Sequence, residues 1–233
     1  MISSKTKIYK YKNQEKTEVL DEVIIEYKLK IFLNDELIIE RFCLKNELEN
    51  MVIGYLISEG YINSYEDLTT VKFKENSKYE GECICKVKNV SLKKEDIDKN
   101  FNISGNSISK LMKEFTNKSN LFKRTGGVHS CGIVKNDKIV YFTDDVGRQN
   151  ALDKMIGYSS KNERELEEII VLFSGRITSE VVEKIKQKNI RGIITKAAVT
   201  FNGQQKGKDK DLIIVGFARA NSFNIYNGED KII

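Results

Sequence analysis

The sequence of 233 residues contains no proline, one histidine and four cysteines, and it has no long apolar run. No stretch approaches the roughly 20 apolar residues that a membrane-spanning helix needs, so the chain is not expected to cross a membrane. Residues 1–18 are too polar for a secretory signal, and we therefore expect a cytoplasmic protein. The cysteines show neither paired CxxC spacing nor a dense disulfide framework, which fits a reducing compartment.

The charged residues nearly balance, with 39 basic and 34 acidic side chains and a net charge of +5. A nucleic-acid-binding protein usually concentrates its basic residues on one face, so this balance does not indicate nucleic-acid binding. It is compatible with an anionic ligand. A chain of this length can bury a core and form either one large domain or two small ones.

The first hundred residues predict a small α+β roll of the order ββαββ. A strand-like pattern from Ile8 to Arg41 is broken at Asn34-Asp35, which is a hairpin signal. The apolar residues of Asn46–Glu59 repeat with helical period and stop at Gly60. Two further strands are expected at Thr69–Lys74 and Glu82–Val90, with Gly81 at the turn between them.

Beyond residue 100, strands and helices alternate, which predicts a second domain of α/β type with a largely parallel, buried sheet. The charged and then Gly/Asn/Ser-rich segment Lys93–Asn106 is the expected linker, so we divide the chain into residues 1–100 and 101–233. Helices are expected at Ser107–Asn117, after Gly147 and at Ser179–Lys188. Strands are expected at Gly132–Asn136 and Lys138–Thr143, as a hairpin around Asp137, and at Ile169–Phe173, Gly192–Thr195, Leu212–Ala218 and Phe223–Tyr226. The segment Phe201–Asp211 is expected to be a polar loop.

Basic side chains follow successive strands of this predicted sheet, namely Arg148, Arg176, Lys196 and Arg219. Ligands of open α/β sheets gather at the carboxyl ends of the strands, so the pattern suggests a shared crevice for phosphate or carboxylate. The alternative is a set of independent solvated charges. In the turn before Arg148, Asp144 or Asp145 could line the same site or simply cap the following helix.

The stretch Thr125–Gly132 holds the single histidine and one cysteine behind a pair of glycines. His129 is either a hydrogen-bonded structural residue or a site residue. Cys131 is a candidate thiolate nucleophile if nearby cations lower its pKa, and otherwise a small buried hydrophobe. Cys83 and Cys85 are one residue apart in a predicted strand and should face the same side. A C-x-C pattern without a second pair favours structural cysteines, so no metal site is expected.

Four segments, in this order and spacing, resemble the FdhD family, the formate dehydrogenase accessory sulfurtransferases. They are TGGVHSCGIV, DDVGRQNALDKMIG, FSGRITSEVVEKIKQKNIRGIIT and VGFARANSFNIY, and Ile53–Ile62 (IGYLISEGYI) is similar to a further family motif. The resemblance implies a C-terminal domain of cytidine-deaminase-like fold beside the smaller N-terminal α+β domain, usually in a homodimer. It also implies that the protein binds the molybdenum cofactor bis-molybdopterin guanine dinucleotide. In the family, a cysteine desulfurase supplies sulfur as a persulfide, and the protein passes it to molybdenum before formate dehydrogenase takes up the cofactor.

The resemblance also assigns cofactor-binding positions. The cofactor-contacting segment of the family falls on Phe217, Ala218, Arg219, Ala220, Asn221 and Ser222. The other family motifs fall on Gly127, His129, Asp145, Gly147, Arg148, Ser174, Gly175 and Arg176. This assignment agrees with the chemistry, because guanidinium groups suit pyrophosphates and a carboxylate can accept the two N–H donors of a guanine edge.

One departure from the family pattern concerns sulfur. The family usually carries a CGxCG loop before the helix at Leu111, and the matching residues here are Ser104-Gly105-Asn106-Ser107. A serine cannot hold a persulfide. The chain therefore either uses another cysteine, with Cys131 the first candidate, or binds and delivers the cofactor without transferring sulfur. The zinc signature of the deaminases is missing, since His129 is followed by Ser130-Cys131 and the chain has no proline.

Overall fold

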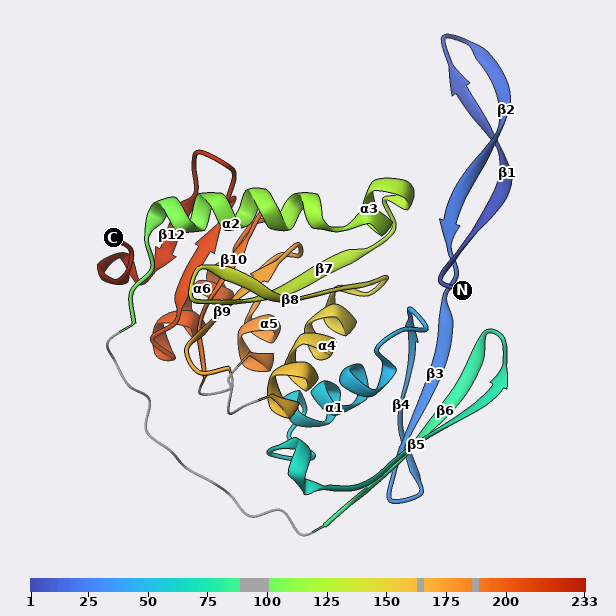
Figure 1. Cartoon of the computed structure of the whole chain (residues 1–233), viewed down its shortest axis with the longest axis horizontal. Helices are drawn as coiled ribbons and strands as arrows, with labels where there is room; N and C mark the ends of the chain where they lie inside the picture. Colours follow the sequence, from blue (N-terminus) through green and yellow to red (C-terminus); the bar gives the residue numbers. More distant parts are fainter. Residues whose placement is uncertain (89–100, 163–165, 186–188) are drawn as a thin grey trace.

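The computed structural model describes residues 1–88, 101–162, 166–185 and 189–233. Its centre is a six-stranded sheet with helices on both faces (Figure 1), so the chain is of mixed α/β type, as predicted. In sheet order the strands are β12 (Asn224–Asn227), β11 (Ile213–Gly216), β10 (Ile190–Thr195), β9 (Ile169–Phe173), β7 (His129–Lys135) and β8 (Lys138–Asp145). Among the helices of the described residues, none is both long enough and apolar enough to span a membrane.

The central sheet is parallel only in its middle. β10 pairs in parallel with β9 and β11, whereas the pairs β7–β8, β7–β9 and β11–β12 are antiparallel. The prediction of a largely parallel sheet is therefore wrong. The hairpin expected around Asp137 is present, with positive φ values of 50° and 56° at Asn136 and Asp137. The antiparallel pairs β7–β9 and β11–β12 are what make the sheet less parallel than expected.

Helices cover the two faces of this sheet. α2 (Gly105–Lys118) buries Leu111, Met112 and Phe115 on one face, as predicted, and the short helix α3 (Asn120–Thr125) follows it. The opposite face carries α4 (Arg148–Lys161), α5 (Ser179–Lys184) and α6 (Phe201–Asp209).

Helix α6 shows that the prediction of a polar loop at Phe201–Asp211 is wrong. The hydroxyl of Thr200 accepts a hydrogen bond from the Gly203 amide at 3.1 Å and so caps the helix. Gly203 and Gly207 lie on one helix face. A Cβ at either position would lie 2.6 Å from a neighbouring atom of Ile177 or Ile214. The glycines, which disfavour a helix by propensity, let this helix pack closely on the sheet.

A second sheet has the order β4-β3-β6-β5, with β4 (Glu36–Cys43), β3 (Tyr27–Leu33), β6 (Glu80–Val87) and β5 (Leu68–Ser77). The predicted hairpin at Asn34-Asp35 is confirmed, with φ values of 49° and 70°. Gly81 was wrongly predicted at a turn. It lies inside β6, where a Cβ would stand 2.0 Å from the Tyr27 hydroxyl, and the turn precedes it.

Helix α1 (Leu48–Ser58) joins this second sheet to the central one. It crosses α4 at Gly54 and Gly157. A Cβ on Gly54 would lie 1.8 Å from the Asp153 carbonyl oxygen, and one on Gly157 would lie 2.0 Å from the Asn50 carbonyl oxygen. One continuous apolar core therefore includes residues of β3, β6, α1, α4 and β9. The predicted domain division at residue 100 lies in 89–100, outside the described residues, and stays a prediction. Short 3₁₀ helices, η1 (Tyr65–Asp67) and η3 (Glu229–Lys231), complete the described elements.

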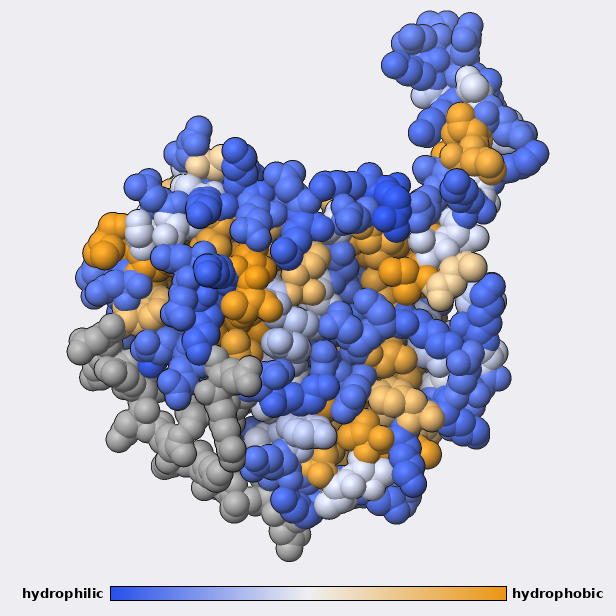
Figure 2. All heavy atoms as spheres, viewed as in Figure 1, coloured by the Kyte–Doolittle hydropathy of each residue, from blue (hydrophilic) through white to orange (hydrophobic). Residues whose placement is uncertain are grey.

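The N-terminus forms an arm. β1 (Ser3–Lys12) and β2 (Glu15–Ile24) make a separate two-stranded sheet that projects from the body (Figure 1). At its base, Ile24 packs with Leu121 and Val128, and Arg124 of α3 donates to Glu22 at 3.0 Å. Figure 2 shows apolar side chains gathered along the arm between hydrophilic ends.

Candidate functional site

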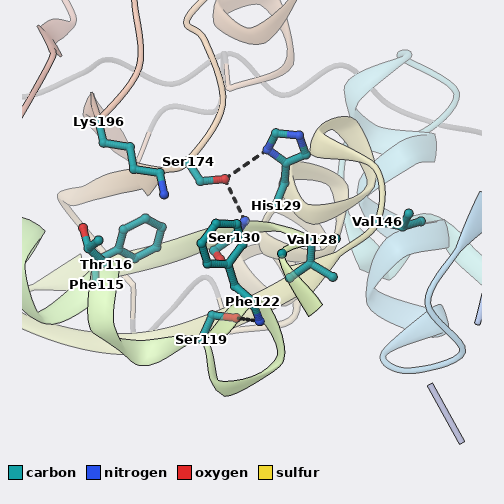
Figure 3. A pocket seen from close by; sticks show the side chains of 12 residues that line it. Phe115, Thr116, Ser119, Phe122, Val128, His129, Ser130, Val146, Ser174 and Lys196 are labelled. Atoms are coloured by element: carbon teal, nitrogen blue, oxygen red, sulfur yellow. Dashed lines mark hydrogen bonds between the residues drawn. The ribbon is translucent and has the colours of Figure 1, made fainter. Parts of the chain in front are cut away.

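A cavity of about 310 Å³ opens where the end of α2, helix α3 and the start of β7 meet the residues that follow β9 and β10 (Figure 3). It is lined by Phe115, Thr116, Ser119, Phe122, Gly126, Gly127, Val128, His129, Ser130, Val146, Ser174 and Lys196. The carboxyl ends of β9 and β10 point to this edge, so the cavity lies where ligands of α/β sheets bind.

Ser174 fixes the position of His129 in the cavity wall. The Ser174 hydroxyl accepts a hydrogen bond from the Ser130 amide at 2.8 Å, and its oxygen lies 3.2 Å from His129 Nδ1 (Figure 3). The Ser174 amide in turn donates to the Ser130 carbonyl at 3.0 Å. The imidazole is therefore held by a hydroxyl that a backbone amide already orients.

The charges of two cations act on this histidine. The pKa of His129 is lowered by its burial first, and then by the positive charges of Arg148 and Lys196. The imidazole is accordingly neutral near pH 7, while the two cations keep the surroundings positive. Lys196 Nζ lies 4.9 Å from the centre of the Phe122 ring, a cation–π contact that holds the ammonium beside the cavity.

Arg148 stands at the first turn of α4, next to the residues that follow β9. Its Cβ lies 3.4 Å from the position that a Cβ on Gly175 would take. Gly175 has no room for a side chain, because the Phe173 ring would be 2.8 Å away. The Nε atom of Arg148 is buried and has no hydrogen-bond partner among the described residues. A buried guanidinium nitrogen without a partner is costly, and an anionic ligand would satisfy it.

The segment after β11 folds against the segment after β10. The Arg219 guanidinium donates to the Lys196 carbonyl at 2.6 Å and to the Ala218 carbonyl at 3.0 Å. Phe217 is 43% exposed and has a positive φ of 50°, a conformation that the hydrogen bond from its amide to the Ala197 carbonyl holds in place. The turn is closed by the Arg219 amide, which donates to the Ser222 carbonyl at 2.8 Å. Ala220, Asn221 and Ser222 are exposed at this turn.

The predicted residues thus fall into separate groups. The cavity wall includes Gly127, His129 and Ser174. Arg148 packs against Gly175 and acts on His129 through its charge, and Arg219 donates to the carbonyl of the lining residue Lys196. Arg176 is exposed to solvent at the end of β9. Gly147 is the N-terminal cap of α4, and its amide donates to Asp145 at 3.0 Å.

Asp145 does not line this cavity, although the family resemblance assigns it to the cofactor site. Its side chain is fully buried and forms a 2.7 Å ion pair with the equally buried Lys154. It also accepts hydrogen bonds from the Leu44 amide, the Gly147 amide and the Asn150 side chain. A carboxylate with these internal partners has no free oxygen for a guanine edge.

The neighbouring carboxylate, Asp144, which the sequence left open as a site residue or a helix cap, supports the cavity wall from behind. Asp144 accepts hydrogen bonds from Ser130 at 2.6 Å and from Ser119 at 2.7 Å, and both serines line the cavity. Ser119 also caps α3 by accepting from the Phe122 amide at 2.9 Å. The hydroxyls were not predicted because α3 was not expected, although a serine followed by a short apolar turn is a recognisable cap signal.

Cys131 is fully buried, and its thiol belongs to the apolar core on the α4 face of the sheet. Burial raises its pKa, so the thiolate needed for sulfur chemistry is disfavoured. The other three cysteines are also buried, and Cys83 and Cys85 share one face of β6 as predicted, with their sulfurs 3.7 Å apart. No group of three or more metal-binding side chains occurs in the described parts of the chain.

The loop that replaces the family's cysteines lies away from the cavity. Ser104 is the N-terminal cap of α2 and Ser107 lies in its first turn, whereas Thr116, near the other end of α2, lines the cavity. At 1.5 Å per residue the helix separates Ser107 from Thr116 by about 14 Å.

The FdhD/NarQ family model matches residues 24–96 and 78–233 of the chain. Similar curated proteins are named sulfur carrier protein FdhD. That of Bacillus licheniformis is 31% identical over 99% of this chain and 97% of its own, and that of Bacillus pumilus is 32% identical over 99% and 98%. A solved structure described as a formate dehydrogenase accessory protein from Desulfotalea psychrophila covers 100% of both chains with a TM-score of 0.85 at 24% identity. At that identity the structure establishes the fold alone.

Proposed function

The chain belongs to the FdhD/NarQ family, and from that premise we propose that it is a formate dehydrogenase accessory protein that binds and delivers the molybdenum cofactor. The bound substrate would be bis-molybdopterin guanine dinucleotide. Its anionic part would bind in the cavity beside Lys196, Arg148 and His129. After delivery, the molybdenum of the cofactor would supply the redox chemistry of the enzyme that receives it.

The observation that carries the proposal is the positive charge at the cavity: Lys196 lines it, and the charge of Arg148, whose buried Nε has no partner among the described residues, acts on the lining residue His129. Guanidinium and ammonium groups at the carboxyl edge of a sheet suit phosphate groups. A cavity of about 310 Å³ is at the lower end of ligand-pocket sizes. It would therefore hold one phosphate-bearing portion of the large cofactor. The exposed Phe217 offers a ring on which a base could stack.

Delivery without sulfur transfer is favoured over the persulfide route of the family. All four cysteines are buried, and serines stand at Ser104 and Ser107. A cysteine desulfurase, the partner that the resemblance implies, would find no exposed thiol to load. Transfer through Cys131 would require the core to open first.

For the C-terminal part, residues 101–233, we keep the cytidine-deaminase-like fold as a proposal. It is supported by the mixed sheet with parallel central strands and helices on both faces. The chemistry of the deaminases does not accompany it, because their zinc signature is missing from the sequence.

Isothermal titration calorimetry with GDP tests the binding proposal. We expect measurable heat with GDP and little with guanosine, because the cations recognise the phosphates. Lys196→Ala should weaken GDP binding about tenfold or more, which corresponds to roughly 1.4 kcal/mol for one charge-assisted contact. Lys208→Ala, at an exposed lysine of α6, is the matched control and should leave binding unchanged. Absence of heat with both GDP and the purified cofactor would refute the proposal.

A further inference from the structure

Hydroxyl groups line the cavity, and hydrogen bonds within the protein use their protons. The hydroxyl of Thr116 donates to the Met112 carbonyl at 2.7 Å. Those of Ser119 and Ser130 both donate to Asp144, at 2.7 Å and 2.6 Å. A hydroxyl has one proton and two lone pairs, so these three groups can offer a ligand only lone pairs.

The hydroxyl of Ser174, which also lines the cavity, fits the same pattern. Its oxygen accepts a hydrogen bond from the Ser130 amide at 2.8 Å and lies 3.2 Å from His129 Nδ1. Burial, and then the neighbouring cations, lower the pKa of His129 and so favour the neutral imidazole. When that imidazole carries its hydrogen on Nε2, Nδ1 accepts the proton of Ser174. This part of the wall therefore accepts hydrogen bonds from a ligand and does not donate them.

Asp144 holds two of these hydroxyls in place from behind the wall. Each of its carboxylate oxygens accepts from one serine, Oδ1 from Ser130 and Oδ2 from Ser119. One carboxylate thus keeps the two serine oxygens next to each other with their lone pairs free. A phosphate is anionic and its oxygens accept hydrogen bonds, so it would meet only acceptors and a negative charge here.

The lining supplies the opposite chemistry at Lys196, whose ammonium donates and cannot accept. Phe122 lies between the two kinds of group. Lys196 Nζ is 4.9 Å from the centre of its ring, and its amide donates to the Ser119 hydroxyl at 2.9 Å (Figure 3). A ligand that fills the cavity therefore needs an anionic group beside Lys196 and hydrogen-bond donors beside Ser119 and Ser130.

We propose that the cavity recognises a phosphorylated sugar, whose adjacent hydroxyls donate to Ser119 and Ser130 while its phosphate lies beside Lys196. The inference rests on the proposed function and names the part of the ligand that this cavity takes. In a nucleotide the ribose carries the phosphate directly, whereas the base lies farther from it, so the sugar and its phosphate suit the two sides of a cavity of about 310 Å³. Asp144 acts as a positioning residue, because it sets the direction of both serine protons.

Calorimetry with altered nucleotides tests which groups donate. GDP should bind about fivefold more tightly than 2′-deoxy-GDP and about 25-fold more tightly than 2′,3′-dideoxy-GDP, since each hydroxyl removed takes away one neutral hydrogen bond. 2′-Deoxy-2′-fluoro-GDP should bind no more tightly than 2′-deoxy-GDP, because fluorine cannot donate a proton.

Asp144→Asn tests the direction of the serine protons. The asparagine amide donates to one serine oxygen, so the proton of that hydroxyl turns toward the cavity, and the negative charge is removed. The preference for GDP over dideoxy-GDP should fall below about fivefold, while inorganic pyrophosphate should bind about threefold more tightly. A merely structural defect would weaken the binding of both ligands. Asp137→Asn, in the exposed β7–β8 turn, is the matched control and should change neither value.

Ser130→Ala gives a second test that leaves the Asp144 carboxylate in place. It should weaken GDP binding about fivefold and leave dideoxy-GDP binding unchanged.

Equal binding of GDP and dideoxy-GDP to the wild type would overturn the inference and leave the proposed function standing. Inosine diphosphate lacks the amino group of guanine. If it binds more weakly than GDP while dideoxy-GDP does not, the donors belong to the base, and the sugar assignment is wrong. If neither GDP nor ribose 5-phosphate gives heat, the inference is overturned, and titration with the purified cofactor decides the function separately.

Discussion

At the scale of single residues, the two neighbouring aspartates of Asp144-Asp145 have different surroundings. The residue pattern left open which of the two could line a site, and the family resemblance assigned Asp145. Strand β8 continues through Asp145, and successive side chains of a strand point to opposite faces. Asp144 therefore reaches Ser119 and Ser130, while Asp145 turns into the core toward Lys154. Residue types alone could not locate the end of the strand, which decides between them.

The buried thiol of Cys131 is not expected to accept sulfur. After incubation with a cysteine desulfurase and cysteine, mass spectrometry should find no persulfide on Cys131, because the thiol is buried and its raised pKa disfavours the thiolate. Cys131→Ala should cost about 1 kcal/mol or somewhat more of unfolding free energy through lost core packing, and should keep GDP binding.

The Bacillus licheniformis sulfur carrier protein, treated in parallel, serves as the comparison for this experiment. A persulfide that is found on Cys131 in the wild type and disappears in Cys131→Ala would restore the family's sulfur route for this chain.

At the scale of elements, sequence patterns located most strands and helices but not how closely they pack. Strand β9 was predicted to the residue as Ile169–Phe173, since a short apolar run between polar segments is a strong strand signal. The turns at Asn34 and Asn136 were also found, because Asn-Asp accepts the positive φ that a tight hairpin needs. The failures at α6 and Gly81 share a cause. In both places a glycine permits close contact in tertiary structure, while its sequence signal suggests a break in local structure.

The crossing of α1 and α4 leaves no room for a side chain at Gly54. Gly54→Ala should destabilise the protein by at least about 3 kcal/mol, at the upper end of overpacking effects, since the new Cβ would lie 1.8 Å from a backbone oxygen of α4. Urea unfolding measures the change. Gly105→Ala is the control, because the nearest atom there is 3.5 Å away and alanine favours the helix by up to roughly 1 kcal/mol. Equal stability of the two variants would mean that the helices do not cross at Gly54.

At the scale of the whole molecule, buried charges lie where separate layers meet. Asp153 of α4 accepts hydrogen bonds from Ser58 of α1 at 3.2 Å and from Lys184 of α5 at 2.8 Å. Lys184 also pairs with Glu59 at 3.1 Å and faces the Tyr55 ring. Removing a partner from such a buried network costs more than the network itself contributes, so it fixes the arrangement of the three helices. The sequence offered no signal for it, because Ser58, Asp153 and Lys184, one from each helix, are 31 to 126 residues apart.

The buried carboxyl of Asp153 should make the stability of the protein depend on pH. Burial raises the pKa of Asp153 from 3.8 to about 6, although Lys184 opposes the shift. The folded protein therefore binds this proton more tightly than the unfolded chain, and the resulting stabilisation is complete below pH 3.8 and lost as the pH rises through about 6. Asp153→Asn cannot titrate, so the stability of wild type relative to this variant should fall by about 3 kcal/mol across that window, at about 1.4 kcal/mol per pKa unit.

Denaturant unfolding of both proteins at pH 4, 5, 6 and 7 measures the difference, with Asp137→Asn in the exposed β7–β8 turn as the control. A difference that stays constant, or that grows in favour of wild type as the pH rises, would show that Lys184 holds Asp153 ionised throughout.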